Sequence, residues 1–122
     1  MRPRVYTILG GYTALEVDAN KAPELLNKLR DVLGKGGEDV EDAIRMIQHF
    51  DTFYNVMQKK FKDFLTPKKN VSELLKGNVL VDKVKLIKKD SNKLVVIVFD
   101  RSISRETIKN ALNNLGYEYD EC

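Results

Sequence analysis

Two short runs of β-favouring residues stand at the start of the chain, at 5–9 and 12–17, and Gly10-Gly11 lies between them. A two-residue link of this kind favours a hairpin, because a type I′ turn needs positive φ at both linking positions. The alternative is that the glycine pair breaks a short helix. We expect the hairpin, since the flanking residues are those that strands prefer.

The middle of the chain carries helical periodicity. Leucine and valine recur at helical spacing within 23–33, and the glycine-rich segment 34–37 ends that pattern. A broad apolar stripe then covers 40–64, and Asp39 is placed to cap the helix that carries it. Pro67 should stop this helix near residue 65, because proline cannot continue a helix. We therefore expect one long amphipathic helix over about 39–65.

Strand and helix patterns alternate in the last third of the chain. Residues 79–89 carry lysines on one face, a turn is expected at 90–92, and 94–99 is a continuous apolar run typical of a central strand buried on both faces. Ser104 can cap a following helix, and 117–119 could add a short closing strand. The whole pattern predicts an α+β fold, with an antiparallel sheet, a long amphipathic helix and a C-terminal ββα(β) unit.

The length of 122 residues and the apolar content of 43% fit one folded domain over 1–122. The link after Pro67 is the one plausible break, and it would divide a hairpin with two helices at 1–66 from a ββαβ unit at 70–122. Within that unit, Asn70 or Ser72 is placed to cap a short helical turn. The chain has no apolar run of membrane-spanning length and a single cysteine, so we expect a cytoplasmic protein without membrane contact.

Few residues could carry catalysis or bind a metal. His49 is the one histidine and Cys122 the one cysteine, so a catalytic base with its partners or a soft-metal site within one chain is not expected. The acidic cluster at 38–42 lacks the spacing of a calcium loop, and helix capping explains it better. The glycine-rich segment 34–37 lacks the spacing of a phosphate-binding loop. We therefore expect no enzyme, no cofactor and no metal site.

Positive charge is concentrated in one region of the chain. Residues 59–93 hold eleven lysines, four acids and no arginine, a formal charge of +7, whereas the overall charge is +3. A regional excess favours a polyanionic partner, and lysine suits contact with phosphates better than the reading of bases. The phosphate contacts that we expect come from Lys59, Lys62, Lys68, Lys69, Lys83, Lys85 and Lys89.

A plain solvated surface explains the same lysines equally well. No aromatic residue lies on the strand face that carries Lys83, Lys85 and Lys89, so stacking of bases is not predicted. If about six of the lysines contacted phosphates, affinity should fall on the order of a thousandfold between roughly 50 and 200 mM salt. On this interpretation the protein is a non-enzymatic accessory subunit that contacts the nucleic-acid backbone.

The aromatic residues of the long helix support an alternative hypothesis. If they do not all find cover within the chain, the helix should pair with another copy or with a protein partner, because large exposed apolar patches mark interfaces. The protein would then be an interaction or regulatory module, and pairing with another copy would make it a homo-oligomer. The candidate interface residues are Phe50, Phe53, Tyr54 and Phe61.

Two parts of the chain resemble known families. Residues 84–100 and 104–117, which end in Leu-Gly-Tyr, resemble the second half of a heavy-metal-associated domain, a ferredoxin-like sandwich. The Cys-x-x-Cys motif of that family is absent here, so the resemblance implies a fold and no metal carriage. Residues 11–20 and 39–47 are similar to the small subunit of archaeal type I-A CRISPR interference complexes. That likeness implies a small, mainly helical, non-catalytic protein that contacts nucleic acid within a larger assembly.

Overall fold

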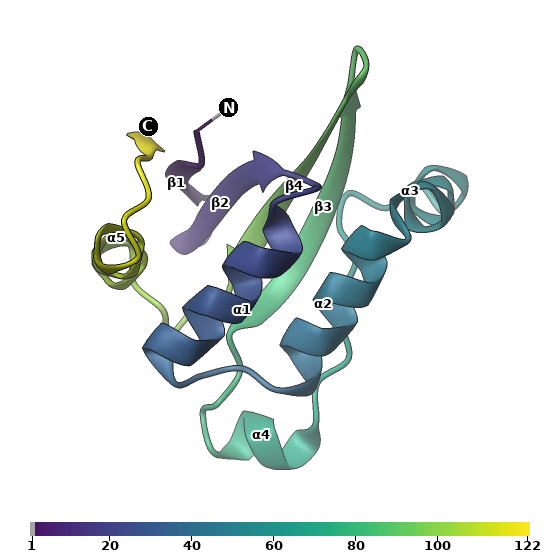
Figure 1. Ribbon diagram of the computed structural model, residues 1–122. Coiled ribbons are helices and arrows are strands. Elements are labelled where there is room, and N and C mark those ends of the chain that lie inside the picture. Colours follow the sequence, from purple (N-terminus) through teal and green to yellow (C-terminus); the bar gives the residue numbers. More distant parts are fainter. Residues whose placement is uncertain (1) are drawn as a thin grey trace.

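Five strands form one mixed sheet, with helices packed against one of its faces (Figure 1). The computed structural model describes residues 2–122. The strands are β1 (Arg4–Ile8), β2 (Tyr12–Asp18), β3 (Val81–Lys89), β4 (Asn92–Phe99) and β5 (Asp120–Glu121). The helices are α1 (Ala22–Leu33), α2 (Glu38–Gln48), α3 (Phe50–Lys59), α4 (Val71–Leu75) and α5 (Arg105–Asn114). The predicted α+β class is confirmed.

The strand order is β3-β4-β2-β1-β5. The β1–β2, β2–β4 and β3–β4 pairs are antiparallel, but β5 runs parallel to β1. The expectation of a purely antiparallel sheet is therefore wrong. The difference arises because β5 pairs with β1 at the edge of the sheet, and these two strands run in the same direction.

Both predicted hairpins are present. Ile8 pairs with Tyr12, so the first link has three residues, not two, and Leu9 belongs to the turn. Gly10 and Gly11 have φ values of +93° and +83°, the conformation for which glycine is suited. The second hairpin closes at Lys89 and Asn92, and β4 is buried on both faces from residue 94 to 99, as predicted.

The long helix predicted over 39–65 is two helices. His49 lies between α2 and α3 with φ −105° and ψ +47°, outside the helical region. Its N–H still donates to the carbonyl of Arg45 and its carbonyl accepts from the N–H of Phe53, so the break is local. The chain then leaves α3 after Lys59, and Phe61 adopts a φ of +52°. Apolar spacing persists on both sides of the break, and periodicity alone therefore could not reveal it.

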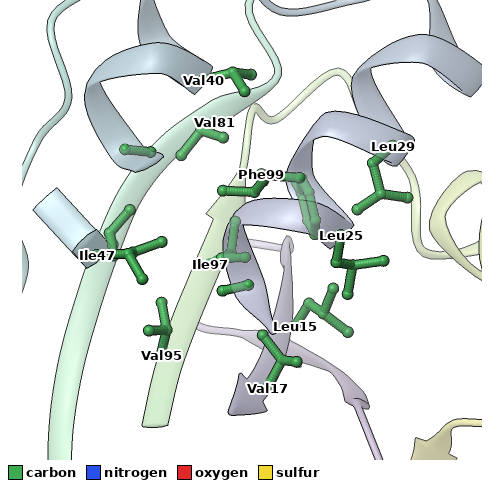
Figure 2. Packing of buried hydrophobic residues seen from close by; sticks show 14 of the residues in the cluster. Leu15, Val17, Leu25, Leu29, Val40, Ile47, Val81, Val95, Ile97 and Phe99 are labelled. Carbon is green, nitrogen blue, oxygen red and sulfur yellow. The ribbon is translucent and has the colours of Figure 1, made fainter. Parts of the chain in front are cut away.

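The main core lies between the sheet and the helices (Figure 2). Inward-facing residues of β2 and β4 meet leucines of α1 and apolar residues of α2. These residues include Leu15, Val17, Val95, Ile97 and Phe99 from the strands, and Leu25, Leu29, Val40 and Ile47 from the helices. Residues from 1–66 and from 70–122 share this core, and the pairing of β2 with β4 joins the two segments in one sheet.

Asp39 connects α2 to β3, a role that differs from the predicted cap. Gly37 stands at the N-cap position, and Asp39 lies inside the helix. One carboxylate oxygen of Asp39 accepts from the N–H of Gly37 at 2.9 Å, and the other accepts from the N–H groups of Leu80 and Val81 at 2.9 and 2.8 Å. The predicted cap at Ser104 is confirmed, since its hydroxyl accepts from the third N–H of α5.

The C-terminal segment is held against β1 by α5. Arg105 donates to the carbonyl of Cys122 at 2.6 Å, and Lys109 pairs with Glu121 at 2.8 Å. A closing strand was expected at 117–119, and it occurs slightly later as β5. Within residues 2–122, no helix combines the length and the apolar character needed to cross a bilayer.

Candidate functional site

The face of the sheet away from the core has its own small apolar cluster. Its buried members are Ala14 of β2 and Val96 and Val98 of β4, and none of its described members comes from a helix. We call this side of the sheet the open face. Strand register aligns side chains across it, so that Tyr6, Ala14, Val98 and Lys83 form one row from β1 to β3. Side chains from four strands therefore meet on a single surface.

Aromatic side chains cover the centre of the open face. Ala14 and Val98 are fully buried although no helix lies over them. Tyr6, Tyr12 and Phe64 pack against this centre, and each keeps part of its surface exposed. Phe64 comes from the segment between α3 and α4, and it reaches the sheet because the next residue bridges to β3. The rings form a partly exposed aromatic rim over an apolar floor.

Cationic groups lie beside these rings. The ammonium nitrogen of Lys83 is 5.7 Å from the ring centre of Tyr12 and 5.2 Å from that of Phe64. Lys85 lies 5.8 Å from the Phe64 ring, and the guanidinium of Arg101 lies 5.9 Å from the Tyr12 ring. All four distances are within cation–π range. The strand β3 carries no aromatic residue, as its sequence shows, but rings from β2 and from the segment before α4 lie beside its lysines.

The positive charge at this end of the open face is weakly neutralised. Lys83 has Asp82 at 3.9 Å, a long and partly exposed pair that contributes little. Over residues 2–122, Lys85 and Arg101 have no carboxylate within 4.0 Å. Three cations therefore lie beside aromatic rings, and few carboxylates are near enough to neutralise their charge. We call Tyr6, Tyr12, Phe64, Lys83, Lys85 and Arg101 the aromatic–basic cluster.

The opposite end of the open face is more acidic. Glu16 pairs with Arg4 at 3.2 Å, and a hollow of about 550 Å³ beside them is lined by Asp18, Lys89 and Asp90, among others. Lys89 therefore lies among carboxylates and apart from Lys83. The pKa of Tyr6, which belongs to the row next to Glu16, is raised by burial and then by the charge of Glu16. Its phenol stays neutral at physiological pH.

The other predicted lysines do not converge on the cluster. The backbone N–H of Lys68 donates to Asp42 at 2.7 Å, and its side chain lines a hollow with the acidic residues of α2. Lys69 donates to the carbonyl of Asp82 at 2.8 Å, a structural role. Lys59 ends α3 and is exposed. Lys62, just beyond, lines one groove together with Lys85. The lysine block of the sequence is thus split over several surfaces.

The candidate interface residues of the aromatic helix are mostly covered by their own chain. Phe50 is 5% exposed and stacks on Tyr54 with ring centres 5.8 Å apart. Phe53 packs against the core, and the guanidinium of Arg45 lies 5.0 Å from its ring. Phe61, in contrast, is 95% exposed. Of these four residues, Phe61 alone offers a large free apolar surface.

Groups that could bind a metal are engaged in other contacts. The buried carboxylate of Asp42 accepts from Arg45 at 2.6 Å and from the backbone N–H of Lys68, and that of Asp39 accepts three backbone N–H groups. Over residues 2–122, no three His, Cys, Asp or Glu side chains gather in a way that could hold a metal ion. His49, between α2 and α3, and Cys122, after β5, are both exposed.

Comparison with protein-family models, with curated proteins and with solved structures gave no match in any of the three. The two family resemblances therefore stay predictions. The order β3, β4, α5 agrees with the element order that the heavy-metal-associated resemblance implies. Residues 12–18 form a strand, whereas the CRISPR-subunit resemblance implies helix there.

Aromatic residues of the cluster were missed by sequence reasoning. Tyr6 and Tyr12 follow the alternation of their strands, which places them on one face with Arg4 and Ala14. That alternation is visible in the sequence, but the pairing of β2 with β4, which brings Tyr12 beside Lys83, is not. The predicted apolar stripe places Phe64 on a helix, but α3 ends at Lys59, before it.

Proposed function

We propose that the protein binds single-stranded nucleic acid on its open face, through the aromatic–basic cluster. The observation that carries the proposal is the position of Lys83, whose ammonium group lies within 6 Å of the rings of both Tyr12 and Phe64. A cation between two partly exposed rings offers a phosphate contact next to surfaces on which bases can stack.

The chemistry of the cluster favours a single strand over a duplex. Unpaired bases can be splayed out and stacked on aromatic side chains, whereas bases in a duplex are already stacked on one another. Lysine supplies a point charge for phosphates and no planar fork for reading base edges. We therefore expect binding with weak sequence preference.

The number of cations in the cluster sets the expected salt dependence. We expect three phosphates of a single strand to be contacted by Lys83, Lys85 and Arg101. A plot of the logarithm of affinity against the logarithm of salt concentration should then have a slope of about −2. Affinity should then fall roughly twentyfold between about 50 and 200 mM salt. This is far less than the thousandfold expected from six lysines, because the remaining lysines lie elsewhere.

The arrangement of elements supports the same use of the sheet. We interpret β2, β3, β4, β5 and the intervening helices as a ferredoxin-like sandwich into which β1 has been inserted beside β2. In RNA-recognition modules, a four-stranded sheet binds single-stranded RNA on its uncovered face. This is an analogy of fold, and the site itself carries the argument.

Fluorescence anisotropy tests the proposal. Fluorescein-labelled oligo(dT) and oligo(U) of twelve nucleotides, and a twelve-base-pair duplex, would be titrated with protein between 50 and 200 mM salt. We expect both single strands to bind more tightly than the duplex, with the salt slope given above. No binding at 50 mM salt, or tighter binding of the duplex, would contradict the proposal.

The subunit part of the proposal, a non-enzymatic accessory protein in a larger complex, comes from the resemblance carried by 11–20 and 39–47, of which the second segment is helical as that family implies and the first is not. A second candidate function, a protein-interaction module, is favoured by the exposure of Phe61. Light scattering over a concentration series, with wild type and Phe61→Ser, tests self-association. A dimer that is lost in Phe61→Ser would favour this second function, and a monomer at all concentrations would count against its homo-oligomeric form.

A further inference from the structure

One edge of the sheet is only partly paired. The N–H of Leu65 donates to the carbonyl of Val84 at 2.7 Å, and the N–H of Val84 donates to the carbonyl of Leu65 at 2.9 Å. Both backbone groups of Val84 therefore point away from β4. Because this direction alternates along an antiparallel strand, the backbone groups of Leu86 and Lys88 also point outward. Within residues 2–122, neither residue has a backbone partner on that side.

The chain itself leaves this edge uncovered. Residues before Leu65 would oppose Leu86 and Lys88 if they continued as a strand, but they turn back toward α3 at Phe61, which has a φ of +52°. A groove of about 530 Å³ remains between α3 and β3. Tyr54 is one of the α3 residues that line the groove. Its other lining residues include Phe61, Lys62, Lys85, Leu86 and Lys88. The groove thus combines unpaired backbone groups, apolar surface and an excess of positive charge, since three lysines and one carboxylate, that of Asp63, line it.

We propose that this groove binds an extended acidic peptide, which adds to β3 as an antiparallel strand. Leu86 and Lys88 would exchange about four backbone hydrogen bonds with it. Side chains of an added strand alternate between the two faces of the sheet. The side chains on the helical face would contact Tyr54 and further apolar residues of α3. The side chains on the open face would contact Lys85. The occupant is therefore a segment that alternates apolar and acidic residues.

Charge argues against a second copy of this chain as the occupant. Pairing of two β3 edges would place Lys85 and Lys88 of each copy close to the same residues of the other, and like charges across strands are destabilising. An acidic residue of a partner strand on the open face would make an attractive contact with Lys85, whereas Lys88 lies on the helical face and pairs with Asp51 at 3.4 Å. The strand-addition proposal does not depend on nucleic-acid binding, since the backbone groups of Leu86 and Lys88 are outside the aromatic–basic cluster, although Lys85 belongs to both surfaces.

Backbone methylation of a probe peptide tests the geometry directly. The fluorescein-labelled peptide DIEVDIE would be compared with its charge-reversed form KIKVKIK and with two N-methylated forms. In an added antiparallel strand, the apolar residues direct their N–H groups toward β3, as Leu65 does toward Val84. We expect N-methylation of the apolar residues to abolish binding and N-methylation of the acidic residues to leave it within about threefold. Equal binding of the two methylated forms would overturn the proposal.

A matched pair of protein variants tests the same edge. Lys88→Pro removes an outward N–H at a site where an edge strand tolerates proline, and Lys88→Ala removes the same side chain but keeps the N–H. We expect Lys88→Pro to weaken DIEVDIE binding at least tenfold more than Lys88→Ala does. The proposal is overturned if both variants bind alike, if KIKVKIK binds as well as DIEVDIE, or if DIEVDIE does not bind wild type at about 50 mM salt. Dissociation of a dimer by the peptide would also overturn it, in favour of a second copy.

Discussion

The ammonium nitrogen of Lys83 lies 5.2 Å from the ring centre of Phe64, on the side of the sheet that no helix covers. Lys83 belongs to β3, whereas Phe64 belongs to the segment that links α3 to α4. The bridge between Leu65 and Val84 brings the two together. The aromatic–basic cluster is therefore a product of tertiary structure, and each of its parts can be tested separately.

Removal of the clustered lysines should weaken nucleic-acid binding more than removal of other lysines of the block. Lys83→Ala/Lys85→Ala and Lys68→Ala/Lys76→Ala each remove two positive charges, so net charge is matched. We expect the first pair to lose about tenfold or more in affinity for oligo(dT) and to flatten the log–log salt slope by about 1.4. The second pair should stay within about threefold of wild type. Equal losses in both pairs would show that binding follows net charge and not the cluster.

Stacking on Tyr12 should contribute to affinity without changing the salt dependence. An aromatic side chain that stacks on a base contributes about 1–3 kcal/mol by alanine substitution, or roughly tenfold to a hundredfold in affinity. Tyr12→Ala should show this loss with an unchanged salt slope, and Tyr12→Phe should retain most of the affinity. Tyr117→Ala is the control, since Tyr117 packs beside Lys28 on the helical side. If Tyr12→Ala binds oligo(dT) as wild type does, the open face does not stack bases.

Local patterns predicted the elements of this fold well. The glycine pair indicated the first hairpin, and the apolar run at 94–99 indicated a strand buried on both faces. Capping by Ser104 was also visible, because a cap depends on residues only three positions apart. The break at His49 was missed, since its neighbours keep helical spacing on both sides.

The site could not be predicted in the same way, because it depends on pairing between distant segments. Lys83 and Lys85 were identified from the sequence, and strand alternation places both on one face. Their aromatic neighbours depend on the place of β4 between β2 and β3, and on the return of the segment with Phe64 to the sheet edge. Regional charge was a poorer guide, since Lys68 lies among the acidic residues of α2.

Loss of the Asp39 carboxylate should destabilise the fold strongly. Asp39 is 2% exposed and accepts N–H groups from the buried residues Leu80 and Val81. In Asp39→Ala these donors lose their partner, and each buried unsatisfied group costs about 1–3 kcal/mol. We expect the free energy of unfolding, measured by urea denaturation, to fall by about 3–5 kcal/mol. Asp39→Asn keeps one oxygen acceptor and should lose less. A loss under about 1 kcal/mol in Asp39→Ala would mean that water replaces the carboxylate.

Acid titration should reveal the ion pairs of Asp51 with β3 and β4. The pKa of Asp51 is lowered from the ordinary aspartate value, first by a hydrogen bond from Lys93 and then by one from Lys88. The two nitrogens lie 3.0 and 3.4 Å from one carboxylate oxygen. Because the folded-state pKa is depressed, the stabilisation is present above the unfolded-state pKa and is lost as pH falls through the folded-state pKa. The carboxylate is exposed, so the effect on stability should be small and screened by salt.

Carboxyl-carbon NMR of Asp51 measures this shift directly. Lys93→Gln should raise the titration midpoint of Asp51 more than Lys88→Gln, since the contact of Lys93 is the larger cause. Lys76→Gln, at the C-terminal end of α4, should leave the midpoint unchanged. A midpoint in wild type at the ordinary aspartate value would show that the pairs do not persist in solution.

A methyl group at Gly36 should be poorly tolerated, in contrast to one at Gly34. A Cβ at Gly36 would lie 2.6 Å from Cγ2 of Val40 and 3.3 Å from Cβ of Leu80, and its φ is +110°. Backbone strain and overpacking each cost about 1–3 kcal/mol, so Gly36→Ala should lower the free energy of unfolding by about 2–6 kcal/mol. At Gly34, where φ is +64°, a Cβ meets nothing within 4 Å, and strain alone predicts a loss of about 1–2 kcal/mol. Urea denaturation of both variants compares the two sites. Equal losses would mean that α2 moves away from β3 to admit the methyl group, and Asp39→Ala would then be expected to destabilise the protein less than proposed above.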